Sequence, residues 1–184
     1  VDIKLHILNI STIEKYDLEK MYKIYDKWPE IARESFESNQ NSIDFEDIEH
    51  IVIAGMGGSG AIGDILSAIL SKTKIHVNVI KGYVLPATTS PNTLVITVSV
   101  SGNTVETLSV LKSAHIIKSK IIAFSSGGKM AEYCTKNKIE HRMVTEYHSP
   151  RASFTSYLYT ILNVLHTTLK IKKQDILESI MELE

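Results

Sequence analysis

Two short stretches of this 184-residue sequence carry residue types that could bind a phosphate ester. Residues 55–60 read GMGGSG and residues 99–104 read SVSGNT, and each stretch directly follows a short apolar run. Glycines let backbone N–H groups approach an anion closely at the start of a helix, and serine or threonine hydroxyls donate hydrogen bonds to its oxygens. Together the two stretches predict a site for a small phosphorylated molecule.

The glycine-rich stretch also satisfies GxGxxG, the pattern of dinucleotide-binding turns. That function calls for an acidic residue near the end of the next strand, where residues 78–86 read NVIKGYVLP without a carboxylate. Lys81 could face the 2′-phosphate of NADP instead, so an NAD(P)-binding domain remains an alternative. A triphosphate-binding loop is excluded, because Gly60 is not followed by the required Lys-Ser/Thr pair. A glycine turn that binds nothing also stays open.

The hydroxyl-rich stretch helps to separate these alternatives. Ser101 or Asn103 alone would be explained best as a helix cap. Two small-residue loops at one sheet edge are harder to explain as caps, and a dinucleotide needs no second serine loop. The pair therefore favours a small phosphate ester over a dinucleotide.

Short apolar runs alternate with helical spacing from residue 49 onward. The strand candidates are residues 50–55, 74–80, 93–99, 119–125 and 139–145, and the helix candidates are 60–72, 103–118, 128–138, 149–171 and 172–184. Most strand candidates are continuously apolar, as expected when helices cover both faces of a sheet. The alternation predicts an α/β fold with a doubly wound parallel sheet, whose loops gather at the carboxyl ends of the strands.

The amino-terminal region has a different pattern. Apolar residues at three- and four-residue steps over 12–38 predict an amphipathic helix or helix pair, with Pro29 in the first turn of the second piece. We expect residues 1–48 to form a helical segment that packs on the core outside the chemistry, and residues 49–184 to form the sheet domain.

Charge and composition exclude several classes of function. The 20 Lys and Arg against 21 Asp and Glu give a net charge of −1, so no whole-chain field attracts nucleic acid or an anionic membrane. No apolar run approaches the ~20 residues that span a bilayer. Cys134 is the only cysteine, which excludes an internal disulfide. We expect a cytoplasmic protein that binds neither nucleic acid nor membrane.

The two loops together resemble the sugar isomerase (SIS) domain, which is flavodoxin-like. GMGGSGAIGD at 55–64 is followed by SVSGNTVET at 99–107, and SPRASF at 149–154 completes a set similar to the bifunctional phosphoglucose/phosphomannose isomerases found mainly in archaea. The three motifs stand in the family's order, and the resemblance spans about residues 15–170. It implies an enzyme that interconverts glucose 6-phosphate or mannose 6-phosphate with fructose 6-phosphate through an enediolate.

The resemblance also implies which residues bind and react. In the family the two loops hold the sugar phosphate, which nominates Gly58, Ser59, Ser99, Ser101 and Thr104. The family's Pro-Arg pair corresponds to Pro150-Arg151, so Arg151 is expected to open a helix and to stabilise negative charge on the enediolate. The following residues, ASFTSYLY, depart from the small-residue and Gly-Tyr pattern of the family, so no role is carried over to them.

The general base is expected outside this chain. Isomerisation moves a proton between C1 and C2, and in the family the glutamate that moves it, like the histidine that assists ring opening, comes from a second SIS domain. The chain is therefore expected to be an amino-terminal half whose partner is a second SIS domain or subunit, as in a homodimer joined through exposed faces of its long helices. Glu106, Glu146 and His148 are local alternatives, each explained more simply by a helix-start carboxylate or a solvated loop.

No metal or organic cofactor is required by such proton transfer, and no histidine pair has convincing metal-ligand spacing. A rival from another class is a SIS sensor that binds a phosphosugar, does no chemistry and relays occupancy to a partner. The motifs do not separate enzyme from sensor, because both need the same phosphate site.

Overall fold

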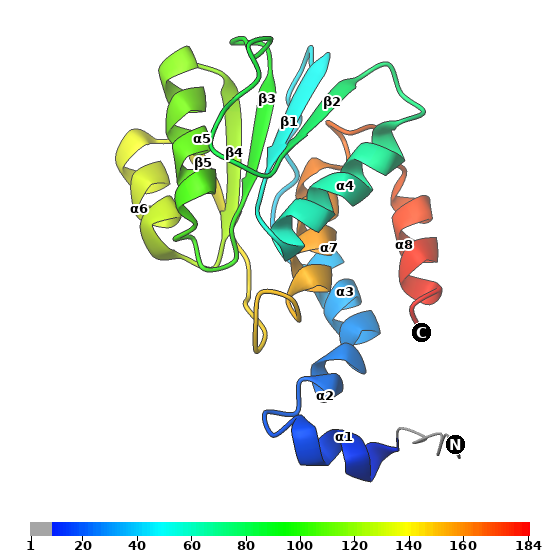
Figure 1. Ribbon diagram of the computed structural model, residues 1–184. Helices are drawn as coiled ribbons and strands as arrows, with labels where there is room; N and C mark the ends of the chain where they lie inside the picture. The colour runs from blue at the N-terminus through cyan, green and yellow to red at the C-terminus, as the bar shows by residue number, and fades with distance from the viewer. Residues whose placement is uncertain (1–8) are drawn as a thin grey trace, which may run out of the picture.

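The computed structural model describes residues 9–184, and its centre is a sheet of five parallel strands. The strands are β1 (His50–Ala54), β2 (His76–Ile80), β3 (Leu94–Val98), β4 (Lys120–Ser125) and β5 (Glu140–Met143). Their order across the sheet is β2-β1-β3-β4-β5, which is the flavodoxin-like arrangement (Figure 1). The predicted doubly wound α/β fold is confirmed, and each strand begins and ends within about two residues of its predicted range.

Burial of both sheet faces explains why these runs are continuously apolar. All five residues of β3 are buried, and Ile53 of the adjacent β1 lies opposite Val79 on one side and Ile96 on the other. Alternate residues enter two separate cores: Ile51 and Ile53 face one, whereas Val52 and Ala54 face the other. A central parallel strand therefore needs apolar side chains at every position.

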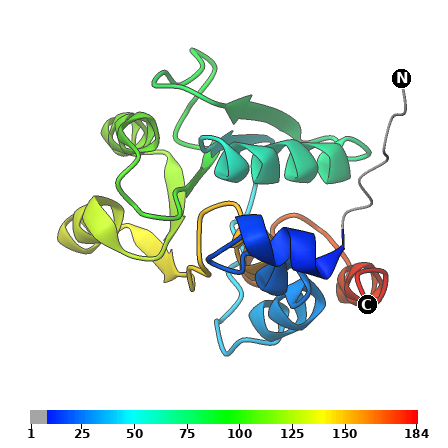
Figure 2. The ribbon, with the colours of Figure 1, turned by 60° about the horizontal axis from the view of Figure 1, so that its bottom comes forward.

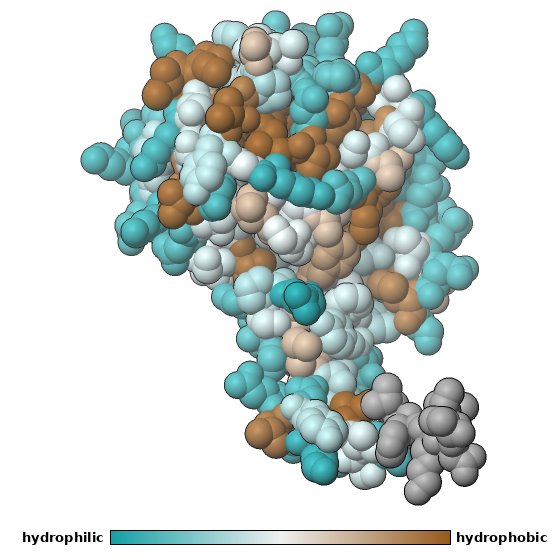
Figure 3. Space-filling model, in the orientation of Figure 1, coloured by the Kyte–Doolittle hydropathy of each residue, from teal (hydrophilic) through white to brown (hydrophobic). Residues whose placement is uncertain are grey.

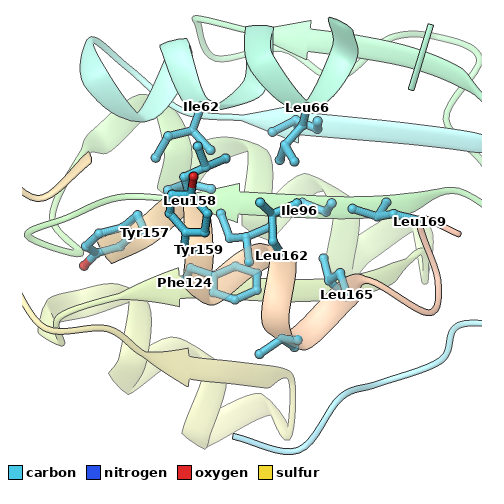
Figure 4. Packing of buried hydrophobic residues seen from close by; sticks show 14 of the residues in the cluster. Ile62, Leu66, Ile96, Phe124, Tyr157, Leu158, Tyr159, Leu162, Leu165 and Leu169 are labelled. Carbon is cyan, nitrogen blue, oxygen red and sulfur yellow. The ribbon is translucent and has the colours of Figure 1, made fainter. Parts of the chain in front are cut away.

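The two sheet faces are covered by different helices. Helices α5 (Val105–Ile117) and α6 (Gly128–Asn137) cover one face, and α4 (Gly58–Leu70), α7 (Phe154–Leu165) and α8 (Lys173–Met181) contribute to the core on the other (Figures 1 and 2). Figure 4 shows Ile62 and Leu66 of α4 packing towards the side chains of α7, with Ile96 and Phe124 of the sheet beside them. Burial of these apolar side chains stabilises the sheet on this side.

Helix α7 is shorter and more buried than its sequence pattern predicts. The expected helix over 149–171 is observed only from Phe154 to Leu165, and every residue from Thr155 to Leu165 is buried. The final helix likewise occupies Lys173–Met181 within the expected 172–184. Because α7 packs against α3 and nearly all of its residues are buried, a contact with a second subunit would have to use other helices.

The described part of the amino-terminal region, from residue 9 onward, forms three helices rather than one or two. These are α1 (Ile10–Tyr16), α2 (Tyr22–Tyr25) and α3 (Trp28–Phe36), with Pro29 in the first turn of α3 as predicted. Helix α3 buries Ala32 and Phe36 in the larger core and also buries Ile31, whereas α1 and α2 bury no residue completely. The start of the proposed segment 1–48 lies outside the described residues.

Some apolar side chains remain exposed on the molecular surface. Figure 3 shows hydrophobic side chains gathered between α4 and α5. Tyr83 and Val84, in the connection from β2 to β3, are 53% and 79% exposed. No helix within residues 9–184 is long and apolar enough to cross a bilayer.

Candidate functional site

The glycine loop turns the chain sharply from β1 into α4. Gly57 precedes the helix with φ of +55°, a conformation that favours glycine, and no side chain caps the helix start. A Cβ on Gly60 would lie 2.8 Å from the carbonyl oxygen of Gly55, so the two residues pass too closely for any side chain. Ser59 is 7% exposed in the first turn of α4, which begins at Gly58. The loop thus presents an uncapped helix amino terminus at the sheet edge.

The serine loop joins β3 to α5 and is held by its own hydroxyls. Ser99 is buried, its N–H donates to the carbonyl oxygen of Phe124 at 3.1 Å, and its Oγ lies 2.9 Å from Oγ1 of Thr104. Whichever hydroxyl donates within this pair, the other retains a proton for an outside acceptor. Ser101 is exposed, and its Oγ accepts from the N–H of Asn103 at 3.3 Å, which leaves its own O–H free to donate.

Simple helix capping does not explain this loop. The residue preceding α5 is Thr104, and its side chain makes no capping hydrogen bond. Asn103 does not cap the helix either: its Oδ1 accepts from the N–H of Lys129 in α6, and its Nδ2 donates to the carbonyl oxygen of Ser101 in its own loop. The start of α5 therefore keeps N–H groups and a positive dipole end without a capping side chain.

A third loop, after β4, supports the serine loop and was missed by the sequence analysis. A Cβ on Gly102 would overlap the carbonyl oxygen of Gly127, and one on Gly128 would overlap that of Ser101. Ser126 Oγ donates to the carbonyl oxygen of Val100 at 2.7 Å. The signal was the dipeptide Gly127-Gly128 directly after an apolar run, which marks a special turn.

The strand order brings the glycine and serine loops to neighbouring positions. Strands β1 and β3 are adjacent and parallel, and the chain leaves them towards opposite faces of the sheet, into α4 and α5. This is the topological switch point, where ligands bind in open α/β sheets. Two uncapped helix starts meet there, so the local field favours an anion.

The turn that carries Arg151 lies against the glycine loop. A Cβ on Gly58 would stand 3.7 Å from the carbonyl oxygen of Pro150 and 3.9 Å from Cα of Arg151. The Arg151 side chain is exposed, and no ion pair involves it among the described residues. Its guanidinium is therefore available to a ligand at this edge.

Arg151 does not open a helix, which corrects the expectation. It lies in a turn three residues before α7, because the fully buried Ser153 bonds to backbone groups of that turn. Ser153 Oγ accepts from the N–H of Tyr147 at 2.8 Å and lies 2.8 Å from the carbonyl oxygen of Ser149. Such side-chain bonds compete with helix formation and hold residues 147–153 as a compact turn.

The three local alternatives for a base have different surroundings. The carboxylate of Glu106 acts on Tyr83, because hydrogen bonding to it and its negative charge raise the pKa of the Tyr83 hydroxyl. Nε2 of His148 lies 3.4 Å from a carboxylate oxygen of Glu19. Glu146 lies 3.4 Å from Oγ of Ser126, so among these side chains it is the one that contacts a site loop.

Three other histidines and Lys81 contact polar side chains within the fold. His50 bonds to Asn78, His115 to Tyr133 and His141 to Ser125, and within residues 9–184 no three His, Cys, Asp or Glu side chains form a group that could hold a metal. Lys81, considered above for an NADP phosphate, pairs with Asp64 at 2.6 Å. An ion-paired lysine is less free to bind a 2′-phosphate, which makes the nicotinamide alternative weaker.

Sequence comparison places this architecture in a family. The SIS domain family model matches residues 44–170, and the chain belongs to that family. Its curated relatives include a bifunctional phosphoglucose/phosphomannose isomerase from Caldicellulosiruptor bescii, 39% identical over 72% of this chain, and another from Aquifex aeolicus, 32% identical over 80%. A D-glucosamine-6-phosphate 4-epimerase from Sulfolobus acidocaldarius is 28% identical over 88% of this chain. The chain covers 40%, 46% and 52% of these three relatives.

Solved structures share the fold at low sequence identity. The C-terminal domain of glucosamine-fructose-6-phosphate aminotransferase from Francisella tularensis matches with a TM-score of 0.65 and 20% identity, covering 89% of this chain and 52% of that one. Tagatose-6-phosphate ketose/aldose isomerase from Escherichia coli matches with a TM-score of 0.55 and 15% identity, covering 80% and 46%. At such identities the likeness supports the fold alone.

Proposed function

We propose that this chain is the phosphate-holding domain of an aldose–ketose isomerase that interconverts glucose 6-phosphate or mannose 6-phosphate with fructose 6-phosphate. The observation that carries the proposal is the meeting of the glycine loop and the hydroxyl-rich loop at the switch point between β1 and β3. The names of the most similar curated relatives support the same substrate class.

In the proposed complex the phosphate accepts hydrogen bonds from the helix starts and the loop hydroxyls. Gly58 and Ser59 supply the start of α4, and Ser99, Ser101 and Thr104 supply the hydroxyls. These donors are held by the backbone before the ligand arrives, so little ordering is needed on binding. The sugar would extend from this anchor towards Arg151.

The reaction itself would be a proton transfer through an enediolate. A base removes the proton from C2 of the open-chain aldose and delivers it to C1, while the negative oxygen of the intermediate needs a positive partner. Arg151 is proposed as that partner, because its guanidinium remains charged throughout. The base is proposed to be a glutamate of a second SIS domain, in the same or a neighbouring polypeptide, and the working enzyme to be a homodimer. We propose that this chain is the amino-terminal half of such a protein.

Calorimetric titration with glucose 6-phosphate tests the proposal directly. The chain should bind glucose 6-phosphate but not glucose, and Ser101→Ala should raise Kd about ten-fold, because a hydrogen bond to a charged phosphate is lost. Ser71→Ala is the matched control, since Ser71 lies at the other end of α4 and bonds only to a carbonyl oxygen of its own helix. Equal affinity of the Ser101 variant and wild type would remove Ser101 from the site. Binding of NADP instead of the sugar phosphate would contradict the proposal.

A further inference from the structure

Three contacts join the amino-terminal helices to the turn that carries Arg151. The carboxylate of Glu19 lies 3.4 Å from His148, Oγ of Ser149 donates to the sulfur of Met21 at 3.7 Å, and Nε1 of Trp28 donates to the carbonyl oxygen of Ala152 at 2.9 Å. In Figures 1 and 2 the loop between β5 and α7 lies on the side of the molecule that faces α2 and the segment joining it to α1. Residues more than 120 positions apart in the sequence are thus held together.

Of these three contacts, the hydrogen bond from Trp28 has a donor that is held rigidly. The indole ring packs edge-to-face on Tyr25, with centroids 4.9 Å apart, and lies 6.1 Å from the ring of Phe154. Trp28 is the first residue of α3, whose Ala32 and Phe36 are buried in the larger core. An aromatic ring fixed on both sides loses little further entropy when its N–H donates.

The acceptor of this bond is next to Arg151 in the chain. Ala152 is completely buried, and its carbonyl oxygen is bonded by Trp28, while Ser153 holds the turn through Tyr147 and Ser149. The turn is therefore fixed by α3 and by its own buried serine. Between these supports, the backbone of Arg151 is held beside Gly58 of the glycine loop.

We propose that Trp28 is a positioning residue for Arg151, so that helix α3 helps to form the phosphosugar site. The indole N–H fixes the carbonyl of Ala152, and this fixes the Cα–Cβ direction of the arginine. The sequence pattern predicts that this segment packs outside the chemistry, and on this proposal it also holds the turn that carries Arg151. This role in turnover rests on the proposed function, whereas the effect of Trp28 on the turn does not.

Trypsin measures the order of this turn without reference to function. Trypsin cleaves the bond that follows an arginine, and Arg151 is exposed. Cleavage after Arg151 nevertheless requires the turn to open. Trp28→Phe keeps an aromatic ring and removes the N–H, so cleavage after Arg151 should be about three- to ten-fold faster, as expected for one lost hydrogen bond. Tyr22→Phe is the control, because Tyr22 bonds to Glu14 within the same helical segment. Equal cleavage rates for Trp28→Phe and wild type would overturn the proposal.

Kinetics of the whole gene product test the link to catalysis. Trp28→Phe should lower kcat about three- to ten-fold with KM nearly unchanged, and adding it to Arg151→Ala should cause no further loss. Additive losses in the double variant would show that Trp28 acts independently of Arg151, which would overturn the positioning role. If Arg151→Ala left kcat unchanged, the proposed catalytic role of Arg151 would fail, while the cleavage rate would still decide whether Trp28 holds the turn.

A third measurement leaves Trp28 in place and guards against a variant that folds poorly. Trp28 is the only tryptophan of the chain, so its fluorescence reports on this contact alone. Glucose 6-phosphate should change the emission of wild type, and the change should be lost in Arg151→Ala at ligand concentrations that calorimetry shows to saturate it. An unchanged wild-type emission with ligand bound would separate Trp28 from the site and overturn the proposal.

Discussion

The hydroxyl oxygens of Ser99 and Thr104 lie 2.9 Å apart and join the end of β3 to the start of α5. Ser99 is 1% exposed, so its hydroxyl has no alternative partner in bulk water. The pair holds the serine loop in a closed form around Ser101. The proposed phosphate site thus depends on a contact within the loop as well as on groups that face the ligand.

Thr104→Val should therefore weaken both the fold and the site. Valine has the shape of threonine without the hydroxyl, so Ser99 loses its partner and the free energy of unfolding should fall by about 1–3 kcal/mol. Denaturant titration measures this loss, and calorimetry should show weaker binding of glucose 6-phosphate. Thr104→Ser keeps the hydroxyl and should retain most of the affinity. A stable Val variant with unchanged affinity would show that the pair does not shape the site.

The geometry of the glycine loop predicts different losses of stability for alanine at Gly60 and at Gly58. A Cβ on Gly60 would lie 2.8 Å from the carbonyl oxygen of Gly55, whereas a Cβ on Gly58 would meet Pro150 and Arg151 at ordinary contact distances of 3.7 and 3.9 Å. Gly60→Ala should destabilise the chain by about 1–3 kcal/mol through overpacking, and Gly58→Ala by less than about 1 kcal/mol. Thermal unfolding of the two variants checks the difference. Similar melting temperatures would contradict the observed turn geometry.

Replacement of Arg151 should affect turnover more than binding. If its guanidinium stabilises the enediolate, Arg151→Ala should lower kcat of the whole gene product by about 10²–10³-fold, with a smaller change in KM. Arg151→Lys is the informative control, since it keeps the charge and loses the planar, bidentate donor geometry. Steady-state kinetics with fructose 6-phosphate measures both constants. A rise in KM alone would make Arg151 a binding residue.

The sequence was sufficient for the sheet and for the two loops because both depend on local features. A buried parallel strand such as β3 is apolar at every position, and Gly57 and Gly60 stand where the backbone requires glycine. The order of the strands then places the loops after β1 and β3 side by side. These steps need no knowledge of distant contacts.

The features that could not be predicted are long-range. Helical spacing continues through residues 149–153, but the buried hydroxyl of Ser153 holds that stretch as a turn, so Arg151 precedes α7. Nothing near Trp28 in the sequence indicates that its indole reaches Ala152, 124 positions away. The contact of Gly102 with Gly127 likewise depends on the pairing of β3 with β4. Local patterns do not contain such contacts.

Acid sensitivity should arise in part from His141, beside the third loop. Nε2 of His141 lies 2.8 Å from Oγ of Ser125, and that hydroxyl donates to the carbonyl oxygen of Gly127. The serine oxygen therefore accepts from the imidazole N–H. Burial lowers the pKa of His141 below its ordinary value of 6.5, Glu140 opposes this shift, and Arg142 adds to it.

The sign of the pH effect follows from this lowered pKa. The unfolded chain binds a proton at His141 more readily than the folded one, so the stabilisation is complete above about pH 6.5 and is lost as the pH falls through the folded value. Denaturant unfolding of wild type and His141→Gln from about pH 8 to about pH 5 measures the contribution, with the difference at pH 8 as the baseline. The stability advantage of wild type over the variant should shrink on acidification, because glutamine does not titrate. A difference that stayed constant or grew towards low pH would show that His141 is not the group responsible.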